Sequence, residues 1–200
     1  MSNMDFPSRR AMPQFLRPGI LLLLCFLATL AAPAALAETR LKIRSASVAL
    51  DEGVYELDAA LDLALPDDAR KAIDAGLTMR LDYEIEIARV RAYLPDDGIA
   101  SLVQTYEVRY HALSQRYLLR NLNTGEQQDF GTLSAALERL SDVRGLPVID
   151  ADLVGAGPTY EVRIRAVLDM GTVPDALSWL LFWTDDWSAS SKWYTWTLRP

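Results

Sequence analysis

Strict alternation of apolar and polar residues is the feature that most constrains this chain of 200 residues. It runs through two long segments, 55–65 and 77–87, in which every second residue is apolar and charged or small residues lie between. A period of two places successive side chains on opposite faces of a β-strand, so each segment is predicted to have one buried and one wet face. The predicted buried residues are Tyr55, Leu57, Ala59, Leu61, Leu63 and Leu65, then Leu77, Met79, Leu81, Tyr83, Ile85 and Ile87.

Two later segments repeat this pattern and complete the prediction of an antiparallel sheet. Residues 106–110 and 160–168 alternate in the same way, and strands with one wet face are typical of antiparallel sheets. The string Asn123-Thr124-Gly125 predicts a hairpin turn between two short strands. After Ile87 the apolar positions change parity, which predicts a β-bulge near Ala88–Arg89.

Three short helices are predicted between these strands. Segment 66–76 begins with a proline and two aspartates and ends at a glycine. Segment 131–145 has leucines at helical spacing behind Thr132 as N-cap, and segment 172–183 begins with a variant of the capping box. We therefore expect a mostly β domain, an antiparallel two-sheet sandwich with two or three short helices. The alternative is an α+β fold with helices packed on one sheet face.

The first 37 residues have the pattern of an export signal. Three arginines precede an apolar run over residues 20–32, and "ALA" ends at Ala37. We predict cleavage between Ala37 and Glu38, which leaves one β-rich domain over residues 38–200. The predicted location is the periplasm of a Gram-negative bacterium. The alternative is an uncleaved segment that anchors the protein to the inner membrane, although the run is shorter than the roughly 20 residues that a spanning helix needs.

Composition after residue 37 excludes several classes of function. The chain carries 20 basic and 27 acidic side chains, and residues 38–200 retain 17 and 26 of them, a net charge of −9. This charge disfavours nucleic acid as a partner. The one cysteine lies in the apolar run, so thiolate chemistry and disulfides are not expected in the mature domain. No long apolar segment follows residue 37, so this part is not expected to span a membrane.

The residues for a familiar catalytic or metal site are also missing. The single histidine, His111, falls on the wet face of its predicted strand, and no serine motif of a hydrolase is present. The aspartates at 142, 150 and 152 do not have the spacing of a calcium loop. We predict no cofactor, no metal and no enzymatic activity. The exception to weigh is Asp185 and Asp186 beside Trp183 and Trp187, an arrangement that could bind or hydrolyse a glycan.

All five tryptophans lie between residues 179 and 196. Tyr194, Trp196 and Leu198 share one parity of the last predicted strand and are expected to face the core, whereas Trp193 falls on the opposite, exposed face. Arginines on a sheet face can be ion-paired with neighbouring strands or can bind anions. The candidate interaction surface consists of Trp179, Trp183, Trp187, Trp193, Arg163 and Arg165.

The C-terminal half also resembles a known family. The strings "DFGTLSAALERL" and "YEVRIRAVLDMGTVPDALSWLLFWTDDWSASSKWYTW" are similar to the bacterial domain-of-unknown-function 4390 family. The resemblance is carried by Phe130, Leu133, Ala136, Leu137, Tyr160, Arg163, Arg165, Leu168, Asp169, Pro174, Leu177, Trp187, Ser191, Trp193 and Trp196. It implies an exported protein without an established activity, often encoded beside a nitrogen-regulation-type sensor kinase.

Two hypotheses of function follow from these observations. The first is an envelope protein that binds an as yet unknown envelope protein without catalysing a reaction. The second is a binder or hydrolase of cell-wall glycans that uses the C-terminal tryptophans and aspartates.

Overall fold

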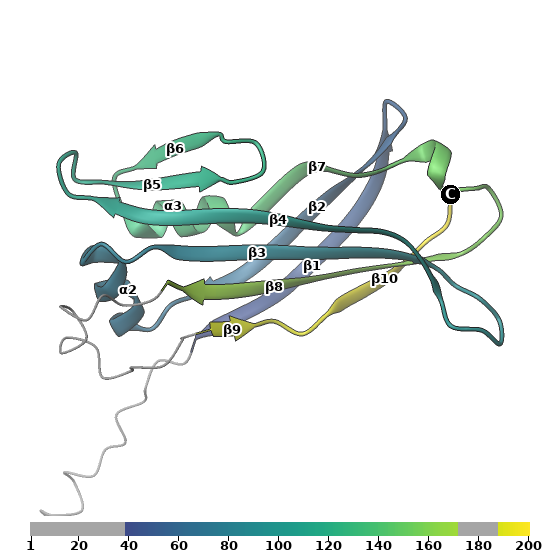
Figure 1. Ribbon diagram of the computed structural model, residues 1–200, viewed down its shortest axis with the longest axis horizontal. Helices are drawn as coiled ribbons and strands as arrows, with labels where there is room; N and C mark the ends of the chain where they lie inside the picture. Colours follow the sequence, from purple (N-terminus) through teal and green to yellow (C-terminus); the bar gives the residue numbers. More distant parts are fainter. Residues whose placement is uncertain (1–38, 172–187) are drawn as a thin grey trace, which may run out of the picture. The chain divides into compact units, whose positions relative to one another are not determined.

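The computed structural model describes residues 39–171 and 188–200. These residues form ten strands, two α-helices and one turn of 3-10 helix (Figure 1). The elements are β1 Arg40–Asp51, β2 Val54–Ala64, α2 Asp67–Asp74, β3 Met79–Arg89, β4 Asp97–His111, β5 Arg116–Asn121, β6 Gln127–Phe130, α3 Leu133–Leu140, β7 Asp142–Asp150, η1 Ala151–Leu153, β8 Tyr160–Met170, β9 Ser188–Ser190 and β10 Tyr194–Leu198.

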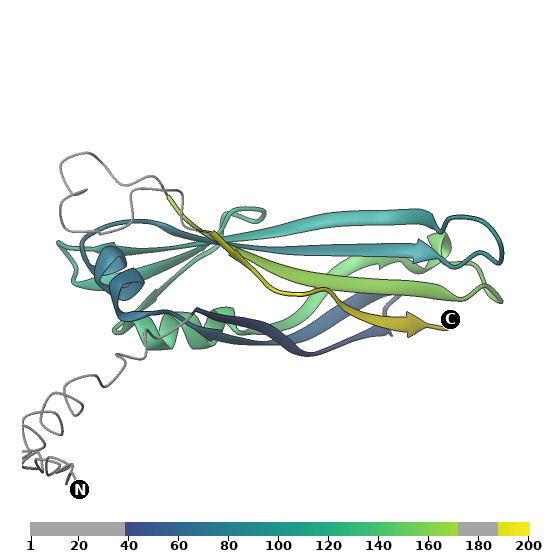
Figure 2. The same cartoon turned by 90° about the horizontal axis from the view of Figure 1, so that it is seen from below.

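The strands form two sheets that lie in separate layers (Figure 2). The small sheet has the order β1-β2-β7, and the large sheet has the order β10-β8-β3-β4-β5-β6, with β9 also paired to β8. Every strand pairing that the structure describes is antiparallel. The protein is therefore a mostly β, antiparallel two-sheet sandwich, as predicted, and not an α+β sheet with helices along one face.

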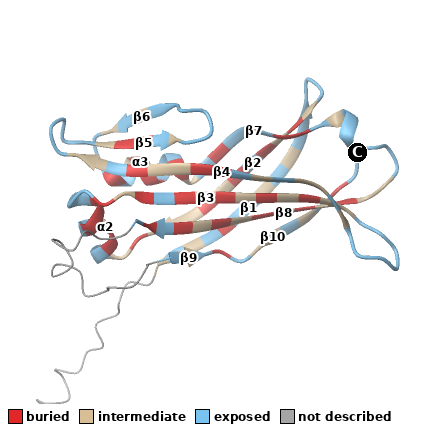
Figure 3. Cartoon of the chain, in the orientation of Figure 1, coloured by how far each residue is buried: buried red, intermediate tan, exposed pale blue. Residues whose placement is uncertain are grey.

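The core lies between the sheets and follows the predicted alternation closely. In β3, the five inward side chains from Met79 to Ile87 are at most 1% exposed, and in β8 the inward side chains from Tyr160 to Leu168 are all fully buried. Figure 3 shows this as buried segments along the middle of both strands. The predicted inward face of β2 is also confirmed, although Leu63 near its end is only partly buried.

Two of the three predicted helices lie in the described residues. Helix α2 follows Pro66 and precedes Gly76, whose φ of +101° suits a glycine after a helix end. Helix α3 is capped by Thr132, whose side chain accepts a hydrogen bond from the backbone N–H of Ala135 at 3.2 Å. Its buried leucines cover the end of the core next to β5, β6 and β7. The third predicted helix, 172–183, lies outside the described residues.

The predicted bulge is present beside the expected place, but on the neighbouring strand. Ile87 pairs with Ala100 and Ala88 pairs with Gly98, so the extra residue is Ile99 of β4. The prediction that β3 carries the extra residue was wrong. Strand β3 ends at Arg89, and Val90 is 46% exposed, so the later apolar residues do not continue the strand's buried face.

The described residues contain no helix long and apolar enough to cross a membrane. The predicted cleavage site, Ala37 and Glu38, lies outside the described residues.

Candidate functional site

The outer face of the large sheet carries a ladder of charged side chains. Residues on β3 and β8 alternate between apolar inward positions and charged outward ones, and the register sets Glu84 opposite Arg165 and Glu86 opposite Arg163. The Nε atom of Arg165 donates to Glu84 Oε2 at 2.6 Å, and that of Arg163 donates to Glu86 Oε2 at 2.8 Å. Opposite charges directly across two antiparallel strands are a stable arrangement. The arginines of the predicted interaction surface are therefore ion-paired.

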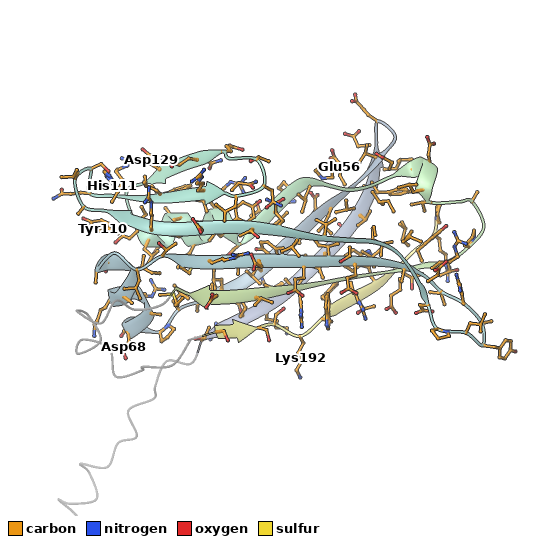
Figure 4. The ribbon with its side chains drawn as sticks, in the orientation of Figure 1. Glu56, Asp68, Tyr110, His111, Asp129 and Lys192 are labelled. Atoms are coloured by element: carbon orange, nitrogen blue, oxygen red, sulfur yellow. The ribbon has the colours of Figure 1, made fainter. Side chains whose placement is uncertain are left out.

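A bulge between β9 and β10 determines which side of the sheet the last tryptophans face. Ser190 pairs with Val167 and Tyr194 pairs with Ile164, which leaves one more residue in this segment than in β8. The buried Ser191 bonds both backbone groups of Ala166, through its N–H at 2.8 Å and its Oγ at 2.9 Å. The extra residue is Lys192, which points away from the sheets in Figure 4.

This register change places Trp193 on the outer face and Tyr194, Trp196 and Leu198 on the inner face. Tyr194 and Trp196 pack against the core and Leu198 is buried, as the alternation predicted. Trp196 remains partly exposed, so its burial is less complete than that of the residues in β3.

Trp193 lies against both arginines of the ladder. The guanidinium carbon is 4.7 Å from the centre of the indole ring for Arg165 and 5.0 Å for Arg163. Each cation–π contact at an exposed site is worth about 0.5–1 kcal/mol, and exposed ion pairs contribute about as little. These contacts bring three side chains together on the outer face of the large sheet. We call Arg163, Arg165, Trp193, Glu84 and Glu86 the outer cluster.

The outer cluster has the composition of a binding surface more than that of a reactive site. Both guanidinium groups already have a carboxylate acceptor, so the geometry favours ion-paired arginines over an anion-binding patch. Tryptophan and arginine are the residues most enriched among those that dominate protein–protein binding energies. The contacts among these side chains lower the side-chain entropy lost on binding.

Two of the residues considered for catalysis or metal binding, His111 and Asp142, are engaged in a turn and an ion pair. His111 lies at the turn between β4 and β5, where its Nδ1 accepts a hydrogen bond from the backbone N–H of Ser114 at 3.3 Å (Figure 4). Within residues 39–171 and 188–200, no three His, Cys, Asp or Glu side chains are grouped to hold a metal ion. Asp142, one of the aspartates weighed as a ligand, pairs with Arg144 at 2.8 Å.

Three tyrosines have pKa values that are raised, which disfavours their use as bases. Burial raises the pKa of Tyr83, and its hydroxyl donates to the carbonyl of Leu140 at 2.7 Å at the end of α3. Burial also raises the pKa of Tyr106. The hydrogen bond to Asp74 raises the pKa of Tyr117 to about 12. All three stay neutral and structural near neutral pH.

Only part of the predicted interaction surface lies together in the described residues. Arg163, Arg165 and Trp193 lie together, whereas Trp179, Trp183, Trp187 and the pair Asp185 and Asp186 lie outside the described residues. Sequence reasoning missed the partners Glu84 and Glu86. Their alternation was visible, but which residues of β8 they face depends on the strand register, which pattern alone does not reveal.

The comparison with protein families gives a match over nearly the whole predicted mature domain. The model of a family described as a domain of unknown function, DUF4390, matches residues 38–197. The chain belongs to this family. The predicted resemblance is thereby confirmed, and the match includes all five residues of the outer cluster. No curated protein and no solved structure matches the chain.

Proposed function

We propose that this DUF4390 protein is a non-catalytic binding domain in the bacterial envelope, and that its partner is a protein. The observation that carries the proposal is the outer cluster, in which Trp193 is packed over two ion-paired arginines on the open face of a rigid sheet. A preorganised Trp–Arg surface of this kind suits a protein interface.

The export signal supports the location in the periplasm. Residues 1–37 have the charged, apolar and small-residue regions that a signal peptidase reads. N-terminal sequencing of the protein purified from the envelope should return Glu38 as the first residue. A protein that begins at Met1 or Ser2 would instead support the anchored alternative.

The sensor-kinase association leads us to propose a partner class. The periplasmic part of a membrane-bound sensor kinase is a protein surface in the same compartment, and binding to it requires no catalytic group from this chain. In this role the protein acts as an accessory of the kinase.

Capture from envelope extract tests the proposal. The full chain, with a C-terminal affinity tag and its own N-terminal segment, is compared with Trp193→Ala and with the control Thr197→Ala, an exposed residue on the same face of β10. We expect wild type and Thr197→Ala to retain the same protein partner and Trp193→Ala to lose it, with melting temperatures close to one another.

A sedimentation assay with purified peptidoglycan provides the opposing outcome. Pelleting of the chain with wall material, with no protein captured in the first assay, would overturn the proposal in favour of the glycan hypothesis. Equal capture by Trp193→Ala and wild type would remove the outer cluster as the binding surface.

A further inference from the structure

Strand β4 has an edge that the rest of the large sheet leaves open. It is 15 residues long and pairs with β3 from Asp97 to Val108. On its other side it pairs with β5 only from Tyr106 to His111. The first half of β4 therefore has a sheet neighbour on one side only, in the part of the chain that the structure describes.

The turn that follows β5 extends the hydrogen bonding along this side of β4 from Tyr106 back to Val103. The backbone N–H of Leu122 donates to the carbonyl of Thr105 at 2.9 Å. The side chain of Asn123 accepts from the N–H of Thr105 at 2.8 Å and donates to the carbonyl of Val103 at 2.9 Å. The asparagine amide thus acts as the last rung of the ladder.

Beyond this rung, backbone groups remain free. Alternate residues of a strand direct their backbone N–H and C=O groups to the same side. The backbone groups of Ser101 and Val103 therefore point toward the open edge, as those of Thr105 do. The N–H of Val103 and both groups of Ser101 have no protein partner among the described residues. Ser101 is exposed and the Val103 side chain is 45% exposed, so the edge is accessible.

This edge lacks the usual protection against pairing. Edge strands are normally blocked by lysine, proline or inward-pointing charges, and the edge strand β1 carries Lys42 and Arg44. The segment Gly98–Val103 contains no charged residue and no proline. Ala100 and Leu102 face the core side yet are only half-buried, whereas their partners on β3, Ile87 and Ile85, are fully buried.

A hollow that spans β8, β3 and the start of β4, next to the strand whose edge is open, is acidic. It has a volume of about 380 Å³, and its uncharged lining comes from residues 87–88 of β3 and 98–101 of β4. Three carboxylates, Glu86, Asp96 and Glu161, and one guanidinium, that of Arg163, line it. The excess of negative charge favours a basic side chain in the hollow.

We propose that the edge Gly98–Val103 of β4 accepts an extended, basic segment of the partner protein as an added strand. Main-chain hydrogen bonds to Ser101 and Val103 supply affinity, and a long Lys or Arg side chain of the segment reaches across β4 toward the acidic hollow. This rests on the proposed function and specifies how the partner binds. Neighbouring strands lie about 4.8 Å apart, so β10, which Trp193 directly precedes, is about 14 Å from β4 and one partner can contact both.

Amide hydrogen exchange of the full chain with a synthetic peptide tests the pairing itself. The probe is the capped hexapeptide Lys-Val-Lys-Val-Lys-Val, and the control replaces its central lysine by proline, which interrupts a strand. We expect exchange at Ser101 and Val103 to slow by about tenfold or more with the probe and not with the control. Slowing at the β1 or β6 edge instead, slowing by both peptides, or none at all would overturn the proposal. Slowing that needs no peptide and rises with protein concentration would assign the edge to a second copy of this chain and also overturn it.

Substitution at Ser101 connects the edge to the partner. Ser101→Pro removes the free N–H without removing a hydrogen bond to β3, and Ser101→Thr is the matched control that keeps the N–H. We expect Ser101→Pro to reduce partner capture about tenfold or more at an unchanged melting temperature, with Ser101→Thr like wild type. Undiminished capture by a folded Ser101→Pro protein would overturn strand addition while leaving the proposed function intact. The hexapeptide measurement decides the matter if Ser101→Pro fails to fold.

Discussion

The two faces of β3 differ in how much they contribute to the stability of the fold. Five inward side chains of the strand, from Met79 to Ile87, are at most 1% exposed and pack into the core. The outward residues between them, from Arg80 to Glu86, are all charged and form ion pairs that remain partly accessible to solvent. Buried apolar groups contribute kilocalories each, whereas exposed ion pairs contribute little. The outer face is therefore free to serve a partner without a large effect on folding.

The largest expected effect is on the inner face. Ile85→Ala should lower the free energy of unfolding by about 2–5 kcal/mol, because it leaves a cavity where Ile85 is fully buried. Glu86→Ala, the next residue along the strand, should change it by about 0.5 kcal/mol or less. Urea denaturation of both variants measures the contrast, and similar losses would contradict the division between the faces.

A smaller loss of stability is expected when the buried hydroxyl of Tyr83 is removed. Tyr83→Phe should lower the free energy of unfolding by about 1–3 kcal/mol, because the Leu140 carbonyl loses its hydrogen-bond donor at the end of α3. The benzene ring stays, so packing is conserved. Thermal unfolding of the variant tests this, and a variant as stable as wild type would show that water replaces the lost donor.

On the outer face, the ion pair between Arg165 and Glu84 should contribute a coupling energy of about 0.2–1 kcal/mol to the free energy of unfolding. A double-mutant cycle with Arg165→Ala, Glu84→Ala and both together measures it by denaturation. A coupling energy above about 2 kcal/mol would mean that the outer cluster stabilises the fold and is not a surface available for binding.

The smallest effect is confined to alkaline pH. Since the pKa of Tyr117 is raised to about 12, above the ordinary value of 10.0, the neutral phenol stabilises the folded state. This contribution is complete below pH 10 and is lost as the pH rises from 10 through 12. Wild type should therefore lose more stability than Tyr117→Phe over this interval. Parallel pH dependence of the two melting temperatures would show that the Asp74 contact is absent in solution.

Sequence pattern predicted the strand faces well because a half-buried strand must alternate. The inward sets of β3 and β8, the Thr132 cap and the inward direction of Trp196 all follow from local periodicity or local hydrogen bonding. Each of these depends on residues that are close in the chain. Such features are encoded locally, which is why they could be read without knowing the sheet order.

The features that depend on distant strands could not be predicted. Arg165 and Glu84, which pair across two strands, are 81 positions apart in the sequence. The extra residue of the bulge is Ile99 of β4, a strand that lies beside β3 only in the folded sheet. The open edge of β4 exists because β5 is shorter than β4, which only the sheet order reveals. Register and strand order are set by tertiary packing, so pattern alone leaves them undetermined.

Photo-cross-linking in living cells tests the central claim that the outer face of the large sheet binds a protein. A photoreactive amino acid is placed in the full chain at Thr195, exposed on the outer face of β10, and separately at Ser47, exposed on β1 of the small sheet. We expect a specific cross-link to an envelope protein at Thr195 that Trp193→Ala abolishes, and none at Ser47. A protein cross-link at Ser47 alone, or no protein cross-link at either position, would contradict it.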